Sequence, residues 1–187
     1  MPSLTANSPL DGFRQDFDGI EIAEVLDLAI VSIATPQGRE AELASAVSEA
    51  YGIALPAVGT SIKAGSAEIR FLGLQPGQCF SVFERQDDRP VETITRKLSD
   101  SGYFTDQSDS WAVLRLSGER SREALERICP LDLHPGKFEP GAVARTAMEH
   151  LGVIILRDED NAFMLFSARS SAPSFLHAVI TSANNIQ

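Results

Sequence analysis

The sequence predicts an α+β fold made of two halves that share one order of elements, β-α-β-β-α. Short stretches rich in β-branched and aliphatic residues have the length and composition of strands. Between them lie segments whose apolar residues recur at helical spacing. This order of elements occurs twice, although sequence identity between the two stretches is negligible. Each half would leave apolar sheet surface for the other to cover, so we expect two intertwined ferredoxin-like halves.

The first half follows a polar N-terminal segment. Residues 1–20 mix Ser, Pro, Asn, Asp and Gly with few aliphatic residues, which predicts a tail that is flexible or that becomes ordered only on a partner. A single strand is predicted at about 22–34, where β-branched and aliphatic residues are frequent. Residues 21–187 are expected to form one domain that contains two pseudo-repeats, at about 22–102 and 110–184.

The first predicted helix begins at Thr35-Pro36, because threonine can cap a helix and proline suits its first position. Gly52 is the residue type that commonly ends a helix. Between these limits one apolar face is expected, formed by Leu43, Ala44, Val47 and Ala50.

Two strands and a helix complete the first half. The strands are predicted at about 67–74 and 78–84, with a turn at Gln75-Pro76-Gly77 between them. The helix starts near Pro90 and stops before Gly102.

The second half repeats the order of the first. Its elements follow from the same kinds of pattern, with a long loop after the first helix. They are strand 110–116, helix 119–128, strand 143–157 with Gly152 as a candidate break, strand 161–167 and helix 171–183.

The composition is that of an acidic globular chain. Its 187 residues are 43% hydrophobic, and 26 acidic against 16 basic residues give a formal charge of −10. This charge repels phosphate backbones, and the sequence has no basic stripe with interleaved aromatic residues, so nucleic acid is not an expected partner. Neither a secretory signal nor an apolar run long enough to cross a membrane is present. We expect a cytoplasmic protein with no membrane partner.

Residue spacing reveals no catalytic constellation. His134, His150 and His177 are far apart, and nothing places them with carboxylates as a metal site or a Ser-His-Asp triad would require. Cys79 and Cys129 match no metal-ligand spacing and are predicted to be inert, Cys79 as a core thiol. We expect no catalytic, cofactor-binding or metal-binding residue on this chain.

The stretch from 131 to 141 is predicted to be a long loop whose path two Pro-Gly pairs fix, and Asp132, His134 and Lys137 decorate it. Such loops on a rigid scaffold often carry binding residues. One interpretation is therefore a partner-docking or ligand-edge loop, and the other is a packed crossover between the halves. Arg169, beside serines that can cap the last helix, is free for a carboxylate on this chain or another.

Several motifs occur in a fixed order along most of the chain. They are the stretch 72–80, the strand and glycine turn 106–118, the loop Cys129 to Pro135 with Phe138 and Gly141, the strand start Val143-Ala144-Arg145-Thr146, and Arg169-Ser170-Ser171-Ala172. In this order they resemble the gamma subunit of heterotetrameric sarcosine oxidase, a relative of the folate-binding aminomethyltransferases. Phe80 stands where that family usually has tryptophan, and Gly73 and Pro76 lie further apart than in its leucine-glycine-proline turn.

The resemblance implies the fold of the aminomethyltransferase folate-binding domain. In those enzymes an aspartate after the glycine of the second-half hairpin assists one-carbon transfer. The corresponding stretch here, 150–155, has no carboxylate and therefore no group there that can exchange a proton. What is implied is a scaffold without an active centre.

The resemblance further implies a supporting subunit of an oxidoreductase complex. That complex would oxidise sarcosine to glycine, reduce oxygen to peroxide and pass the methyl carbon to tetrahydrofolate. FAD, FMN, NAD and tetrahydrofolate would belong to the alpha and beta subunits, zinc to delta, and no cofactor to this chain. The alpha subunit would be its direct partner. The expected docking residues are Asp132, His134, Lys137, Arg145 and Arg169.

Two alternatives differ in class. A free-standing folate-binding aminomethyltransferase-like enzyme or repair protein would need a carboxylate in a central cavity. A small-molecule-sensing regulatory module built on paired ferredoxin-like halves would be a homo-oligomer with ligand-dependent stability.

Overall fold

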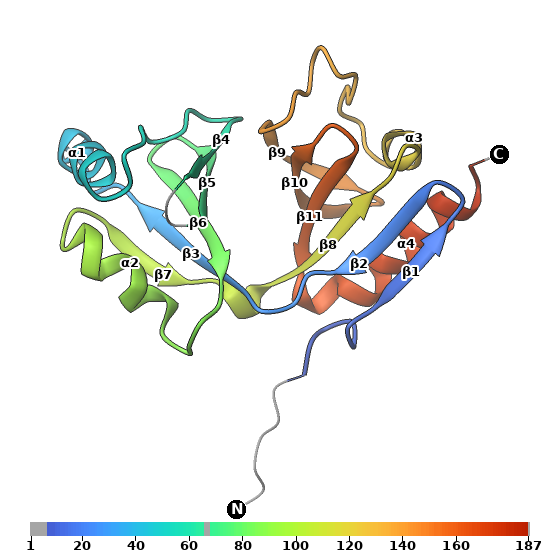
Figure 1. The fold of residues 1–187 in the computed structure, drawn as a ribbon, viewed down its shortest axis with the longest axis horizontal. Helices are drawn as coiled ribbons and strands as arrows, with labels where there is room; N and C mark the ends of the chain where they lie inside the picture. The colour runs from blue at the N-terminus through green and yellow to red at the C-terminus, as the bar shows by residue number, and fades with distance from the viewer. Residues whose placement is uncertain (1–6, 66–67, 187) are drawn as a thin grey trace, which may run out of the picture. The chain divides into compact units, whose positions relative to one another are not determined.

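The computed structural model describes residues 7–65 and 68–186, and the chain divides into two compact units (Figure 1). Unit 1 comprises Met1–Leu26, Ser110–Glu139 and Thr146–Gln187, and unit 2 comprises Asp27–Asp109 and Pro140–Arg145. None of the helices in the described ranges has the length and apolar character that a membrane span needs.

Unit 2 has a five-stranded antiparallel sheet with two helices. The strands, in spatial order, are β4 (Ser61–Ala64), β5 (Ile69–Gln75), β6 (Gln78–Glu84), β3 (Leu28–Ala34) and β7 (Tyr103–Asp106). Helix α1 (Glu40–Tyr51) connects β3 to the β4–β5 strands, and α2 (Pro90–Leu98) connects β6 to β7. Apart from the added edge strand β4, the order β3-α1-β5-β6-α2-β7 and its strand arrangement are those of a ferredoxin-like fold.

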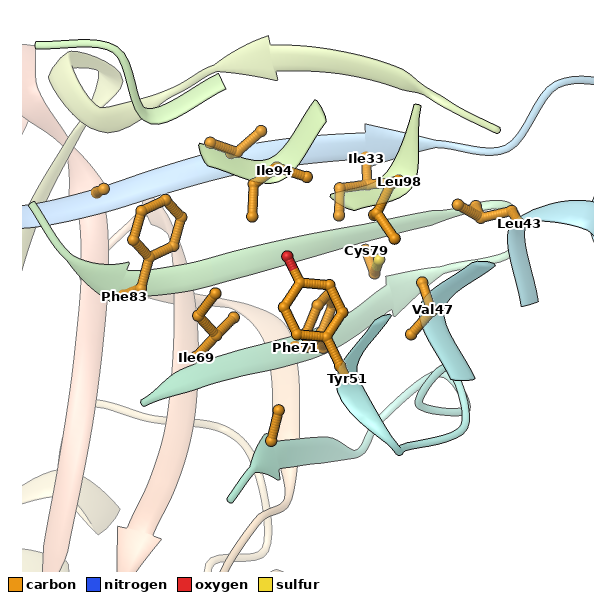
Figure 2. Packing of buried hydrophobic residues seen from close by; sticks show 13 residues of the cluster. Ile33, Leu43, Val47, Tyr51, Ile69, Phe71, Cys79, Phe83, Ile94 and Leu98 are labelled. Atoms are coloured by element: carbon orange, nitrogen blue, oxygen red, sulfur yellow. The ribbon is translucent and has the colours of Figure 1, made fainter. Parts of the chain in front are cut away.

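The helices of unit 2 bury their apolar faces against one face of this sheet (Figure 2). Leu43, Val47 and Tyr51 recur every four residues along α1, so they share one side of the helix. Full burial of one such side chain stabilises the fold by about 1.5–3 kcal/mol. The other members of this core come from the sheet and from α2: Ala29, Val31, Ile33, Ala64, Ile69, Phe71, Cys79, Phe83, Ile94 and Leu98.

Tyr51 leads to the first testable prediction. Its ring packs edge-on against Phe71 with centroids 5.1 Å apart, and its hydroxyl is buried without a hydrogen-bond partner in the described part of the chain. Burial also raises the pKa of Tyr51 to about 12. Tyr51→Phe should therefore leave the free energy of unfolding unchanged or raise it by about 1 kcal/mol, because an unpaired polar group is removed. Urea denaturation tests this, with Tyr103→Phe on the surface as control; a loss above about 1 kcal/mol would reveal a partner for the hydroxyl.

Unit 1 repeats the architecture with a six-stranded sheet. Its strands, in spatial order, are β1 (Arg14–Phe17), β2 (Ile20–Glu24), β8 (Trp111–Ser117), β11 (Ala162–Ala168), β10 (Leu151–Glu159) and β9 (Val143–Met148). Helix α3 (Ser121–Glu126) follows β8, and α4 (Ala172–Asn184) follows β11. Short 3₁₀ turns at Ser108–Ser110 and Arg169–Ser171 precede β8 and α4.

The two units are interleaved along the sequence. In unit 2 the strand beside the first strand, β3, is β7, which follows α2. In unit 1 the equivalent place beside β8 is taken by β2, which comes from the N-terminal hairpin. The predicted α+β class with two intertwined ferredoxin-like halves is therefore confirmed, with one edge strand of unit 1 supplied from the start of the chain.

Two sequence predictions near the N-terminus are wrong. The single strand predicted at 22–34 is two strands, β2 and β3, which belong to different sheets and are separated by exposed Leu26 and by Asp27 at φ 53°. The predicted flexible tail includes β1, which pairs antiparallel with β2. Asp18-Gly19 between them is a strong hairpin signal that was missed. Residues 1–6 of the predicted tail lie outside the described residues.

The boundaries of other elements show which sequence signals predicted the start or end of a helix or strand correctly. Helix α1 begins at Glu40, not at Pro36, and the N–H of the proposed cap Thr35 donates to the Gly77 carbonyl at 2.8 Å. Gly52 ends this helix at φ 68°, as predicted. The sequence patterns also missed β4 and β7, and the strand predicted at 143–157 is broken at 149–150 and not at Gly152.

A polar turn after β7 explains the start of the sequence motif 106–118, which begins at Asp106. The Ser108 hydroxyl donates to Asp106 Oδ1 at 2.6 Å and accepts the Ile30 N–H at 3.0 Å. The Ser108 N–H also donates to Asp106 Oδ1, at 2.9 Å, and the Gln107 N–H donates to the Ile30 carbonyl at 2.8 Å. These bonds satisfy backbone groups where the chain leaves β7, so the motif has a structural role.

Glycine is required at two of the motif positions. A Cβ on Gly73 would lie 2.2 Å from the Ala57 carbonyl oxygen, because the loop before β4 passes directly beside β5. The Gly73 N–H donates to the Thr60 carbonyl at 2.9 Å, and its own carbonyl accepts the Gly59 N–H. A side chain has no room at Gly118 either. This residue has φ 120°, and a Cβ built there would lie 2.3 Å from the Gly19 carbonyl oxygen.

Candidate partner-docking site

The loop between α3 and β9 is held in one shape by its own hydrogen bonds (orange in Figure 1). Asp132 Oδ1 accepts the His134 N–H at 3.0 Å, and His134 Nδ1 accepts the Gly136 N–H at 3.2 Å. The His134 carbonyl accepts the N–H groups of Lys137 and Phe138 at 2.8 and 2.9 Å. Asp132, His134 and Lys137 are all exposed, so the loop presents an acid, an imidazole and an ammonium group on an ordered backbone.

Arg157 anchors this loop to the sheet of unit 1. Its side chain is 3% exposed, and it donates through Nη1 to the Phe138 carbonyl and through Nη2 to the Asp160 carbonyl, each at 2.6 Å. The guanidinium also lies 5.8 Å from the centroid of the Phe163 ring. Sequence reasoning missed this residue, although a lone arginine directly after the apolar run Val153–Leu156 was a visible signal.

The other two predicted docking residues are not part of this loop. Arg145 is exposed in unit 2, with its guanidinium 5.7 Å from the centroid of buried Phe80. Arg169 donates through Nη2 to the Asn7 carbonyl at 2.5 Å, so it has a partner on its own chain. Glu24 holds the same N-terminal stretch, because its carboxylate accepts from the Ser8 hydroxyl and the Gly12 N–H at 2.9 and 2.8 Å.

The described residues show no cluster suited to a metal ion. In residues 7–65 and 68–186, no three or more His, Cys, Asp and Glu side chains are placed to bind one. His134, His150 and His177 are each exposed, on a loop, a hairpin turn and α4. The residues at 151–155 form the start of β10, where Val153, Ile154 and Ile155 are buried aliphatic side chains.

The two cysteines lead to a prediction on thiol reactivity. Both are buried and unpaired, and Cys79 is the core thiol predicted from the sequence. Burial raises the pKa of Cys79 to about 12 and raises that of Cys129 as well. At pH 9, iodoacetamide should modify Cys79 in the folded chain about a hundredfold more slowly than in the urea-unfolded chain, because the thiolate is the reactive form. Mass spectrometry of timed samples measures this; equal rates would contradict the burial.

The strand order and the interleaving of the two units identify the fold class of this chain. Two ferredoxin-like units interleaved in this way are shared with the glycine cleavage system aminomethyltransferase T from Bartonella henselae, at a TM-score of 0.62 and 12% identity. The match covers 84% of this chain but only 44% of that enzyme. This is therefore an α+β chain with an aminomethyltransferase-like fold, about half the length of that enzyme.

The family follows from sequence comparison. The sarcosine oxidase, gamma subunit family matches residues 36–184, and the chain belongs to this family. Relatives named sarcosine oxidase subunit gamma come from Corynebacterium sp. strain P-1, 26% identical over 92% of this chain and 87% of the relative, and from strain U-96, 25% identical over 73% and 66%. A chain of the heterotetrameric sarcosine oxidase from Corynebacterium sp. U-96 superposes with a TM-score of 0.79 and 23% identity, covering 96% of this chain and 95% of that one.

Proposed function

We propose that this chain is the non-catalytic gamma subunit of a heterotetrameric sarcosine oxidase and that it supports the alpha subunit. The family match over residues 36–184 is the observation that carries the proposal. The complex would oxidatively demethylate sarcosine to glycine with formation of peroxide and methylene-tetrahydrofolate. Residues 21–187 would act as one gamma-type domain in the cytoplasm.

The partner subunits would hold the chemistry. FAD, FMN, NAD and tetrahydrofolate would lie on the alpha and beta subunits and zinc on delta, with alpha as the direct contact. The aliphatic start of β10, where related aminomethyltransferases are expected to carry an aspartate, supports a role for this chain that does not include proton transfer.

The docking surface would include Asp132, His134 and Lys137 on the loop, together with Arg145 and Arg169. The bonds within the loop and the Arg157 anchor support this role, because a loop already ordered loses little conformational entropy on binding. Arg169 would act by holding the N-terminal stretch that contains Asn7.

Co-expression with the candidate alpha, beta and delta subunits tests the function. A tagged chain should recover all three in fixed stoichiometry, with flavin absorbance and sarcosine-dependent peroxide formation. Recovery of the chain alone, or as a colourless homo-oligomer, would contradict the proposal and favour the small-molecule-sensing alternative.

Charge reversal in the loop tests the docking surface. Lys137→Glu keeps every loop hydrogen bond described above, since only the backbone of Lys137 takes part in them. It should weaken assembly about tenfold, because a like charge then faces the partner's carboxylates. The exposed substitution His177→Glu on α4 is the matched control, and assembly equal to wild type in Lys137→Glu would remove the loop from the interface.

A further inference from the structure

Strand β7 forms one edge of the sheet of unit 2. It pairs antiparallel with β3 along its whole length, from Tyr103 opposite Ala34 to Asp106 opposite Val31. In the described part of the chain, no strand of this sheet lies on its other side (Figure 1). The backbone groups of β7 that point away from β3 are therefore open to pairing with another strand.

The internal repeat shows what covers this edge in unit 1. There β2 takes the place beside β8 that β7 takes beside β3, and β1 pairs antiparallel with the outer side of β2. Arg14 of β1 also donates to Glu21 of β2 at 2.6 Å. Unit 2 has no described counterpart of β1, which is why its sheet has five strands and that of unit 1 has six. Because β1 comes from outside the repeated β-α-β-β-α order, an added extended segment already covers this edge once in the molecule.

The hydrogen-bond register identifies the open groups on β7. The Gln107 N–H donates to the Ile30 carbonyl at 2.8 Å, so these two residues form a hydrogen-bonded pair. Such pairs recur at every second residue of an antiparallel ladder, so Thr105 and Tyr103 also direct their N–H and C=O groups toward β3. The N–H and C=O groups of Phe104 and Asp106 therefore point away from β3, and no strand or loop of the described chain pairs with them.

Strand β7 also carries an exposed aromatic side chain. Among the described residues, Leu26, Val58 and Tyr103 are large, hydrophobic and exposed, and only Tyr103, at 67%, lies in a strand. Its cross-strand neighbour on β3 is Ala34, whose methyl group is too small to cover the ring. Edge strands are normally protected by charged side chains, as the exposed charges of β1 protect the edge of unit 1. An exposed tyrosine on an open edge is instead typical of a protein interface.

Charge favours a different protein over a second copy of this chain on the edge. Each copy has a formal charge of −10, so two copies repel each other. Asp106 is one of the two residues with outward backbone groups, and pairing two β7 strands would place both copies of this carboxylate on one short ladder, where like charges destabilise pairing. In the described chain the Asp106 carboxylate accepts hydrogen bonds from Ser108, which is uncharged. A neutral or basic segment therefore complements this edge better than a second β7 does.

We propose that β7 is the docking edge for an extended segment of a partner subunit, which adds a sixth strand to the sheet of unit 2. The segment is neutral or basic, and its backbone pairs with the outward N–H and C=O groups of Phe104 and Asp106. A β-branched or aromatic side chain of the segment packs beside Tyr103, as cross-strand neighbours do. The inference rests on the proposed function, because it places a contact of the same complex on unit 2.

Residue-resolved hydrogen exchange tests the pairing in the assembled complex. The amides of Phe104 and Asp106 should exchange freely in the isolated full chain and about a hundredfold more slowly in the complex with the co-expressed partner subunits. The Thr105 amide is the internal control, because it faces Ser32 and should exchange slowly in both states. Free exchange of Phe104 and Asp106 in an assembled complex would overturn the docking edge while the proposed function stands.

Tyr103→Ala tests the side-chain contact. It should weaken assembly severalfold and leave the melting temperature of the isolated chain unchanged, because the ring is exposed there. Val58→Ala is the matched control, since Val58 is 56% exposed in a loop of the same unit and should not affect assembly. Assembly of Tyr103→Ala equal to wild type would contradict the proposal. Protection of Phe104 and Asp106 that grows with the concentration of the isolated chain would identify a second copy as the occupant instead, and failure of wild type to assemble would overturn the proposed function and this inference together.

Discussion

Gly73→Ala should lower the free energy of unfolding by about 3 kcal/mol or more, because the added methyl group meets backbone atoms that cannot rotate away. The new Cβ would lie 2.2 Å from the Ala57 carbonyl oxygen and 2.9 Å from that of Pro56. Relief requires the loop before β4 to move, which would break the bonds of Gly73 with Gly59 and Thr60. Urea denaturation followed by circular dichroism measures the loss.

Gly152→Ala is the matched control for this prediction. Gly152 also lies in a strand, but no heavy atom outside its immediate chain neighbours lies within 4 Å of a Cβ built there. Its replacement should change stability by less than about 1 kcal/mol, in the stabilising direction, because the unfolded chain loses conformational freedom. Equal effects at the two positions would contradict the close approach of the loop to β5.

Arg157→Ala should be the second large effect, at about 3 kcal/mol. Removal of the guanidinium leaves the carbonyls of Phe138 and Asp160 without their donor and removes the cation next to the Phe163 ring. The loop between α3 and β9 should become mobile as well, because Phe138 is the point at which Arg157 holds it. Hydrogen exchange at residues 131–139 should accelerate, and Lys137 should become accessible to trypsin.

Arg115→Ala provides the comparison for this arginine. Arg115 forms an ion pair with Glu159 at 3.4 Å, in which the side chain of Glu159 is 65% exposed and that of Arg115 is 34% exposed. Such pairs contribute at most about 1 kcal/mol, so the loss should be small and the loop should keep its protection from exchange. If Arg157→Ala behaved in the same way, the loop would be held by other contacts than the two carbonyl bonds.

Elements with local signals could be predicted from the sequence, and elements defined by distant partners could not. Helix α2 has proline at its first position and buried Ile94 and Leu98 at helical spacing, so it was found. Strands β1 and β7 have four residues each, and three of the four side chains in each are exposed. They are strands because β2 and β3 lie beside them, and no periodicity within four residues can report that pairing.

The same distinction applies to the candidate site. The exposed loop residues were found because proline and glycine mark loops and charged side chains decorate this one. The anchor Arg157 was not found, because its role depends on the Phe138 carbonyl, 19 positions away. Charged residues on a helix face or in a strand look like ordinary surface positions until the fold brings their neighbours together.

The interleaved chain order has a consequence for biosynthesis. The hairpin of β1 and β2 leaves the ribosome first, but its partner strand β8 is made about ninety residues later, and a lone hairpin is marginally stable in water. Asp27–Asp109, which is all of unit 2 except Pro140–Arg145, emerges in the interval and can fold during translation. Strands β1 and β2 are therefore made first but join their sheet late. In nascent chains that have left the ribosome only as far as Trp111, residues 27–109 should be folded while the β1–β2 hairpin still lacks its partner strand β8.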